Sequence, residues 1–193
     1  MSHISSIGAG MFSDLAICRD TTEVAAAIAN PSEANFKACF ATELANGSPV
    51  TVAAGEFTRI KNIREFPAMG TPPNVVNVPV YGQKTSSQIQ GQSDAPSMEI
   101  QMNYVGTEWQ DAADYLGSLV GDGLQYVFRF ALLNAEPESG FASAVGELGA
   151  VENSQYFWIG KMEAIQVNPQ LTDSNTATVT ITVQSDFYGA FTS

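Results

Sequence analysis

Alternation of apolar and polar residues dominates the chain from residue 57 onward and predicts a series of β-strands. The cleanest case spans residues 98–105, where four apolar side chains alternate with polar ones. The same period of two recurs at residues 126–132, 156–167 and 176–185, and we expect a bend in the second of these at Gly160. Successive side chains of a strand point to opposite faces, so each strand would bury one face and expose the other.

Two earlier strands are predicted at residues 57–66 and 75–81. The first carries its basic side chains on an exposed edge or face, and these are Arg59, Lys61 and Arg64. The second contains Pro79, which lacks the N–H that a β-ladder needs. We therefore expect residues 75–81 to form an edge strand.

A polar segment, residues 82–97, separates the strand at 75–81 from the one at 98–105. Its one large apolar residue is Ile89, so it cannot build a core of its own, and it is too long for a hairpin turn. Two interpretations fit: a surface loop, or an arm that becomes ordered against another subunit. The candidate contact residues of this arm are Lys84, Gln88, Gln90 and Gln92.

One amphipathic α-helix is predicted over residues 107–120. Thr107 and Gln110 have the spacing of a capping box, and Gly121 is placed to end the helix. Apolar residues recur between them with the helical period. These are Trp109, Ala112, Ala113, Leu116, Leu119 and Val120.

The first 56 residues carry the weakest pattern. Asp20 and Glu23 have the arrangement of a capping box and predict a short helix through residues 24–28. Residues 36–43 fit a helix or a strand equally well. We therefore treat residues 1–56 as an N-terminal extension of uncertain fold.

The chain of 193 residues has the length of a single domain. We expect a mainly β fold, a β-sandwich or barrel with one flanking α-helix, whose core spans residues 57–185. The segment at residues 134–155, rich in glycine and glutamate, interrupts this core as an acidic insertion.

Charge is distributed unevenly along the chain, whose net charge is −12. Residues 1–84 hold six basic and seven acidic residues, whereas residues 85–193 hold two basic and thirteen acidic ones, a net charge of −11. Tight binding of nucleic acid needs clustered lysine and arginine, so this chain is not expected to hold phosphates. The acidic half serves either as a solvated surface or as a surface that repels phosphate.

The strand at residues 176–185 has an outward face of threonines that carries no charge, namely Thr178, Thr180 and Thr182. Exposure to bulk solvent alone does not account well for this composition, because solvated strand faces usually include charged residues. We expect this face to meet another molecule.

The cysteines, Cys18 and Cys39, form no metal-binding or disulfide pattern, and we expect buried free thiols. The chain has no apolar run of about eighteen residues and no secretory signal. These absences predict a protein that does not enter a membrane and that folds in a reducing cytoplasm.

Catalytic signatures are missing from the sequence. The single histidine is His3, and no nucleophile-elbow motif occurs. Residues 173–175 begin a calcium loop but lack its glycine and final glutamate. We expect no catalytic residue, no metal site, no bound cofactor and no enzymatic activity.

The chain resembles the major tail tube protein of long-tailed bacteriophages of the lambda type, both in the order of these elements and in the amino-acid sequence of several of them. The residues that carry the resemblance are 57–65, the arm, 97–103 leading into 108–116, 125–130, 157–162 and 176–183. Together they span about 57–185. The family's fold is similar to that of the type VI secretion tube protein.

The resemblance implies hexameric rings that stack into a tube in the virion tail, assembled in the host bacterial cytoplasm. Its partners would be copies of itself, the tape measure, tail terminator and distal tail proteins, and DNA that passes without tight binding. The arm would contact neighbouring subunits. Glu99, on the polar face of its strand, is the candidate for lining the bore.

A second interpretation is a β-sandwich module that binds a ligand such as carbohydrate at a virion or cell surface. Such a module needs an exposed aromatic platform. The tryptophans available for it are Trp109 and Trp158.

Overall fold

The structure is a computed structural model that describes residues 13–44, 54–68, 75–79, 81–82, 87–90, 97–110, 115–132 and 154–189. Its elements in chain order are β1 (Asp14–Cys18), α1 (Thr21–Ala29), α2 (Glu33–Ala38), β2 (Thr42–Leu44), β3 (Glu56–Arg59), β4 (Ile63–Glu65), β5 (Val75–Val78), β6 (Ser87–Gln90), β7 (Ser97–Asn103), a 3₁₀ turn (Leu116–Leu119), β8 (Tyr126–Leu132), β9 (Ser154–Asn168), β10 (Thr176–Val183) and β11 (Tyr188–Gly189). Strands predominate among these elements, so the prediction of a mainly β protein is confirmed.

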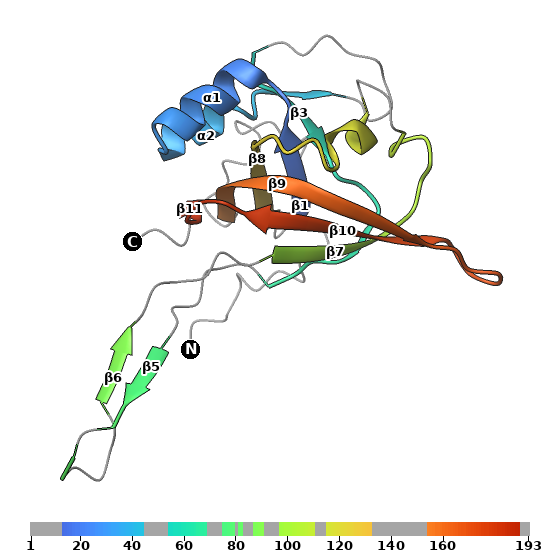
Figure 1. Ribbon diagram of the computed structural model, residues 1–193. Helices are drawn as coiled ribbons and strands as arrows, with labels where there is room; N and C mark the ends of the chain where they lie inside the picture. Colours follow the sequence, from blue (N-terminus) through green and yellow to red (C-terminus); the bar gives the residue numbers. More distant parts are fainter. Residues whose placement is uncertain are drawn as a thin grey trace, which may run out of the picture.

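Within the described residues, nine strands form one sheet in the order β2-β3-β1-β8-β9-β10-β7-β4, with β11 beside β9 (Figure 1). Neighbours are antiparallel except β2 and β3, which are parallel. Residues 56–65 form β3 and β4, which lie at or next to opposite ends of this order, and they contact both β1 and β7. The Ile60 amide donates to Leu15 of β1 (2.8 Å), and the Asn62 carbonyl accepts from Asn103 of β7 (2.9 Å). The sheet therefore closes on itself like a barrel.

The closed sheet surrounds an inner core, to which β1, β7, β8, β9 and β10 all contribute. At its centre the rings of Phe128 and Trp158 stack with centroids 5.6 Å apart. In β7 and β10, every second residue is buried here, as the alternation predicts. The strands expected at residues 98–105, 126–132 and 176–185 are thus confirmed within one to two residues of their predicted ends.

α1 and α2 cover one part of the outer surface of the sheet, over β1 and β8 (Figure 1). Each begins at a capping side chain: Asp20 accepts from the amides of Thr22 and Glu23 (2.9 and 3.2 Å), and Ser32 accepts from that of Asn35 (3.3 Å). The apolar residues that α1 and α2 bury against the sheet form a second, helix-side core. The helix predicted from Asp20 is confirmed.

β1 corrects the boundary that we drew at residue 56. This strand, Asp14–Cys18, is buried along its whole length and lies between β3 and β8 inside the sheet. Residues 14–44 are therefore part of the fold rather than an extension of it. In the ambiguous stretch at residues 36–43, the structure ends α2 at Ala38 and begins β2 at Thr42.

The helix predicted over residues 107–120 is wrong. A Cβ on Gly117 would clash with the Gln110 carbonyl oxygen, whereas residues seven apart in a continuous helix are separated by about 10 Å along its axis. Tyr115 is extended (φ −108°, ψ 161°), and only Leu116–Leu119 turn helically. Trp109, Leu116 and Leu119 are nevertheless buried in the inner core, so the apolar pattern predicted burial correctly. Residues 111–114 lie outside the described part.

The strand predicted at residues 57–66 is divided into β3 and β4. Asn62, between them, has φ +61°, a left-handed conformation that turns the chain from β1 toward β7. Arg59 was expected on an exposed edge, but its side chain is only 14% exposed and contacts Asp14. Arg64 is exposed as expected.

Two more strand predictions need correction. β5 ends at Val78, because Pro79 cannot continue the ladder. β9 runs from Ser154 to Asn168, so it starts two residues before and ends one residue after the strand predicted at 156–167, and its register is irregular opposite Thr180 and Ile181. A Cβ on Gly160 would lie 2.6 Å from the Thr182 carbonyl, so this glycine permits close strand packing. Most of the acidic insertion lies outside the described residues.

Leu116→Ala should lower the free energy of unfolding by about 2–5 kcal/mol, because it opens a cavity in the inner core. Leu116 is 1% exposed. Leu124→Ala is the matched control, since Leu124 is 58% exposed and its truncation should cost less than about 0.5 kcal/mol. Urea unfolding of the two variants measures both values. Equal losses would contradict the placement of Leu116.

Candidate functional site

The outer surface of the sheet has a second part, beside the part that α1 and α2 cover. It is built from β7, β10 and the second half of β9. The side chains here are polar, and we call them the polar face: Ser97, Glu99, Gln101, Lys161, Glu163, Gln166, Thr178, Thr180 and Thr182. Because the opposite side chains of the same strands fill the inner core, the polar face points away from the barrel interior.

Strand register brings the predicted residues together on this face. Thr180 of β10 lies opposite Glu99 of β7, and Thr178 lies opposite Gln101. On its other side β10 pairs with β9, so that Thr182 lies opposite Lys161. The three threonines are half-buried between their neighbours, and Glu99 is exposed. The sequence placed Glu99 and the threonines on polar faces of two separate strands, and the register makes these faces one surface.

Carboxylates outnumber cations on and beside the polar face. Glu163 accepts a hydrogen bond from the Thr182 hydroxyl (2.8 Å). Glu65 of β4 borders, together with Glu99 and Gln101, a hollow of about 170 Å³. Against these three acids stand Lys161, which is half-buried, and the exposed Arg64 next to Glu65 in β4. The surface therefore combines neutral hydroxyl and amide groups with a surplus of negative charge.

β5 and β6 form a separate two-stranded ladder that lies apart from the main sheet (Figure 1). Gln88 and Gln90 of the predicted arm lie in β6, opposite Asn77 and Val75 of β5. Lys84 and Gln92 lie outside the described residues. Among the described strands, β5 and β6 pair only with each other, so each presents one edge of backbone N–H and C=O groups.

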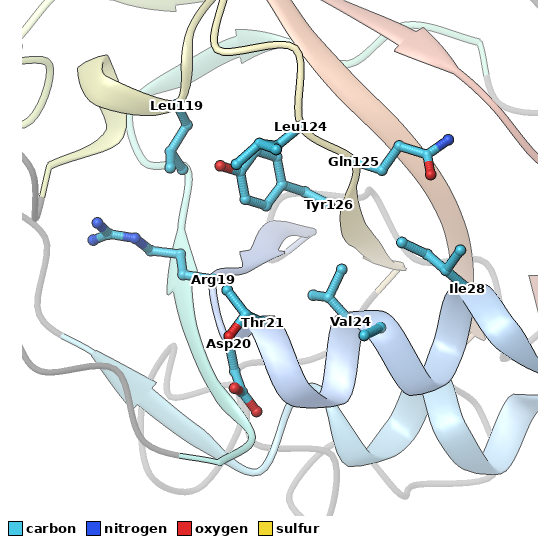
Figure 2. Close-up of a pocket in the computed structure, with 10 residues that line it drawn as sticks. Arg19, Asp20, Thr21, Val24, Ile28, Leu119, Leu124, Gln125 and Tyr126 are labelled. Carbon is cyan, nitrogen blue, oxygen red and sulfur yellow. The ribbon is translucent and has the colours of Figure 1, made fainter.

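An apolar pocket of about 380 Å³ lies between α1 and the start of β8 (Figure 2). Val24 and Ile28 project into it from α1, while Leu119, Leu124 and Tyr126 line the opposite side. The Tyr126 hydroxyl donates to Asp122 (2.5 Å). Burial, followed by this hydrogen bond, raises the pKa of Tyr126. The lining residues come from distant segments that share no motif, so no sequence pattern indicated this pocket.

Asp14, which the sequence analysis also missed, holds two arginines. It accepts from Arg59 Nε (2.6 Å) and Arg129 Nη2 (3.2 Å). Arg129 is fully buried, and its guanidinium carbon lies 4.7 and 4.9 Å from the ring centroids of Phe40 and Phe57. Burial lowers the pKa of Arg129 to about 10 while Asp14 acts to raise it, so the guanidinium is charged at neutral pH. The cluster supports the helix-side core.

Two further observations bear on function. Among the described residues, no group of three or more His, Cys, Asp or Glu side chains is arranged to hold a metal ion. Trp109 and Trp158 are buried, so neither provides a platform for a carbohydrate ring.

The comparisons with known proteins add no identification: no protein-family model matches this chain, and no curated protein matches it. In the part of the chain that the structure describes, neither α1 nor α2 has the length and apolar character that crossing a bilayer requires.

Proposed function

We propose that this protein is the structural subunit of a bacteriophage tail tube, which assembles into stacked hexameric rings and forms a conduit for DNA. The observation that carries the proposal is the polar face. One part of the sheet's outer surface is apolar and is covered by α1 and α2. The other part, the polar face, is neutral to acidic. The helix-covered part would stabilise the subunit, and the polar face would line a water-filled channel.

The chemistry of the polar face fits a surface along which DNA slides. A basic lining would hold phosphates through counterion release. Carboxylates such as Glu99 and Glu65 repel phosphates instead, and this repulsion acts within about 8 Å at physiological salt. The threonine and glutamine side chains beside them offer hydrogen bonds without a fixed positive charge. DNA would pass such a wall without tight binding.

The β5–β6 ladder supports self-assembly. An exposed strand edge is a template for pairing with another chain, and this ladder stands away from the sheet, where it can reach a neighbour. In the proposed tube this ladder, whose strand β6 belongs to the arm, links the subunits. The tape measure, tail terminator and distal tail proteins would contact the finished tube, which belongs to the virion.

A ligand-binding module is the second candidate, and the apolar pocket beside α1 favours it. Its apolar lining residues, among them Val24, Ile28 and Leu119, lie beside the polar Arg19, Asp20 and Gln125. Its one aromatic residue, Tyr126, is buried. A small, mainly apolar ligand therefore fits it better than a sugar, because sugar sites usually stack rings on exposed aromatic side chains.

Electron microscopy of concentrated, purified protein distinguishes the two candidates. A tube subunit forms rings or tubes of uniform diameter in negative stain, whereas a binding module remains monomeric. Sedimentation of the same samples at several salt concentrations quantifies the polymer. A protein that stays monomeric under all of these conditions, with no tube in any particle, contradicts the proposal.

Glu99→Lys should slow DNA ejection without preventing tail assembly. The substitution puts six cations into each ring, where they bind phosphates transiently, and raised salt should relieve the defect. The measurement is the ejection rate of purified particles at two ionic strengths. Glu33→Lys, the same charge change on exposed α2, is the matched control and should eject normally. A normal rate for Glu99→Lys at low salt would remove Glu99 from the bore.

A further inference from the structure

Two thiols are buried together beneath the helices. Cys18 ends β1 and Cys39 directly follows α2, and both side chains are completely inaccessible to solvent within the helix-side core. The Cys18 thiol lies 3.5 Å from the Glu56 carbonyl oxygen, and the Cys39 thiol lies 3.5 Å from that of Asn35. Both cysteines are reduced in this structure.

Both cysteines lie beside the same backbone segment, Gly55 and Glu56. A Cβ on Gly55 would lie 2.7 Å from the Ala38 carbonyl oxygen, next to Cys39. The amides of Ala41 and Thr42 also donate to the Gly55 carbonyl (2.9 and 3.1 Å). Cys18 reaches the following residue, Glu56, with its thiol. The end of α2 therefore packs against Gly55, and the end of β1 contacts the next residue, Glu56.

The ionisation of Cys39 agrees with this contact. The neighbouring Cys18 thiol is the main influence that raises the pKa of Cys39, and burial is the second. The thiolate is the form that attacks a disulfide, so the packed pair reacts slowly. Reaction requires that α2 first move away from the sheet.

We propose that Cys18 and Cys39 form an intramolecular disulfide that fastens the helices to the sheet when the protein meets a low-molecular-weight disulfide oxidant. One cysteine thiolate attacks the oxidant, forms a mixed disulfide and releases one thiolate of the oxidant. The second cysteine then attacks the protein sulfur of the mixed disulfide and releases the other. The two cysteine thiols lose two electrons and two protons, and the two thiolates released from the oxidant take up these protons to become two thiols.

Closure would tie together the segment from residue 18 to residue 39, which contains both α1 and α2. A cross-link that closes about twenty residues restricts the unfolded chain and should shift the unfolding equilibrium roughly 100-fold toward the native state. Neither the polar face nor the β5–β6 ladder belongs to this segment. The inference is therefore independent of the proposed function.

The test uses the full-length protein and oxidised glutathione, with and without a urea concentration just below the unfolding transition. We expect both thiols to disappear from a monomer whose intact mass falls by two hydrogens and carries no glutathione. The loss should be faster in urea, which opens α2 more often. The oxidised protein should then unfold at a higher temperature than the reduced protein, and reduction should reverse the shift.

Cys39→Ala and Cys18→Ala are the controls, and each should end as a glutathione adduct with no gain in melting temperature. The comparison of oxidised with reduced wild type needs no substitution, so it remains valid if either variant fails to fold. Wild type that yields only glutathione adducts or linked dimers would overturn the proposal. So would an intramolecular disulfide that lowers the melting temperature, because the native fold would then be strained by the bond.

Discussion

Deletion of residues 85–94 should abolish polymerisation and leave a folded monomer. The deletion removes β6 and with it the partner that β5 has among the described strands. Among the described strands β6 pairs only with β5, so the deletion leaves every strand pair of the nine-stranded sheet in place. Negative-stain microscopy measures polymer formation, and circular dichroism with a thermal melt measures folding.

A replacement of residues 85–94 by ten glycine and serine residues is the matched control for this deletion. It preserves the chain length but weakens the β-ladder, because glycine and serine are poor strand formers. We expect it to fail in assembly as the deletion does. Normal tubes from the deletion variant would show that β6 takes no part in assembly. Normal tubes from the replacement alone would show that the arm acts through its length.

Asp14→Ala should lower the free energy of unfolding by about 3–5 kcal/mol, because it leaves buried positive charge without its carboxylate. Asp14 is 3% exposed and holds both Arg59 and Arg129. Arg129 cannot reach water from its position between Phe40 and Phe57. Chemical denaturation at neutral pH, where both arginines are charged, measures the loss.

Glu33→Ala is the control, because it removes an ion pair that is exposed to solvent instead of a buried one. Glu33 and Lys37 are 2.6 Å apart on the surface of α2, with 55% and 43% of their side chains exposed. Solvent screens this pair, so its removal should cost about 0.3–0.5 kcal/mol. If Asp14→Ala cost no more than Glu33→Ala, the buried cluster would contribute little to stability.

Local patterns in the sequence predicted the elements whose cause is local. Alternation placed β7 and β10 because each buries one face in the inner core and leaves the other face more exposed, and period two is a property of any such strand. The cap at Asp20 predicted α1 because its carboxylate satisfies amides only two and three residues away. The same rules failed at β1, where Asp14–Cys18 is buried on both faces and shows no alternation.

In the segment after β7, the sequence predicted correctly which side chains are buried but not the conformation of the backbone. Trp109, Leu116 and Leu119 have helical spacing and are buried as that spacing requires. Their backbone nevertheless turns back near Gly117, which lies against the Gln110 carbonyl. The apolar spacing determined which side chains enter the core. The packing of the chain against the sheet determined the backbone path that takes them there.

For the candidate surfaces, the sequence by itself determined that Glu99 and the threonines of β10 lie on polar strand faces and that the arm has no core of its own. Only the tertiary structure decided that Glu99 lies opposite Thr180, that β6 pairs with β5, and that Cys18 and Cys39 are buried in the same core. The physical reason is the distance along the sequence over which each interaction acts. Propensity, capping and alternation act over a few residues, whereas register, sheet closure and the shared burial of the cysteines depend on segments that the chain brings together only when it folds.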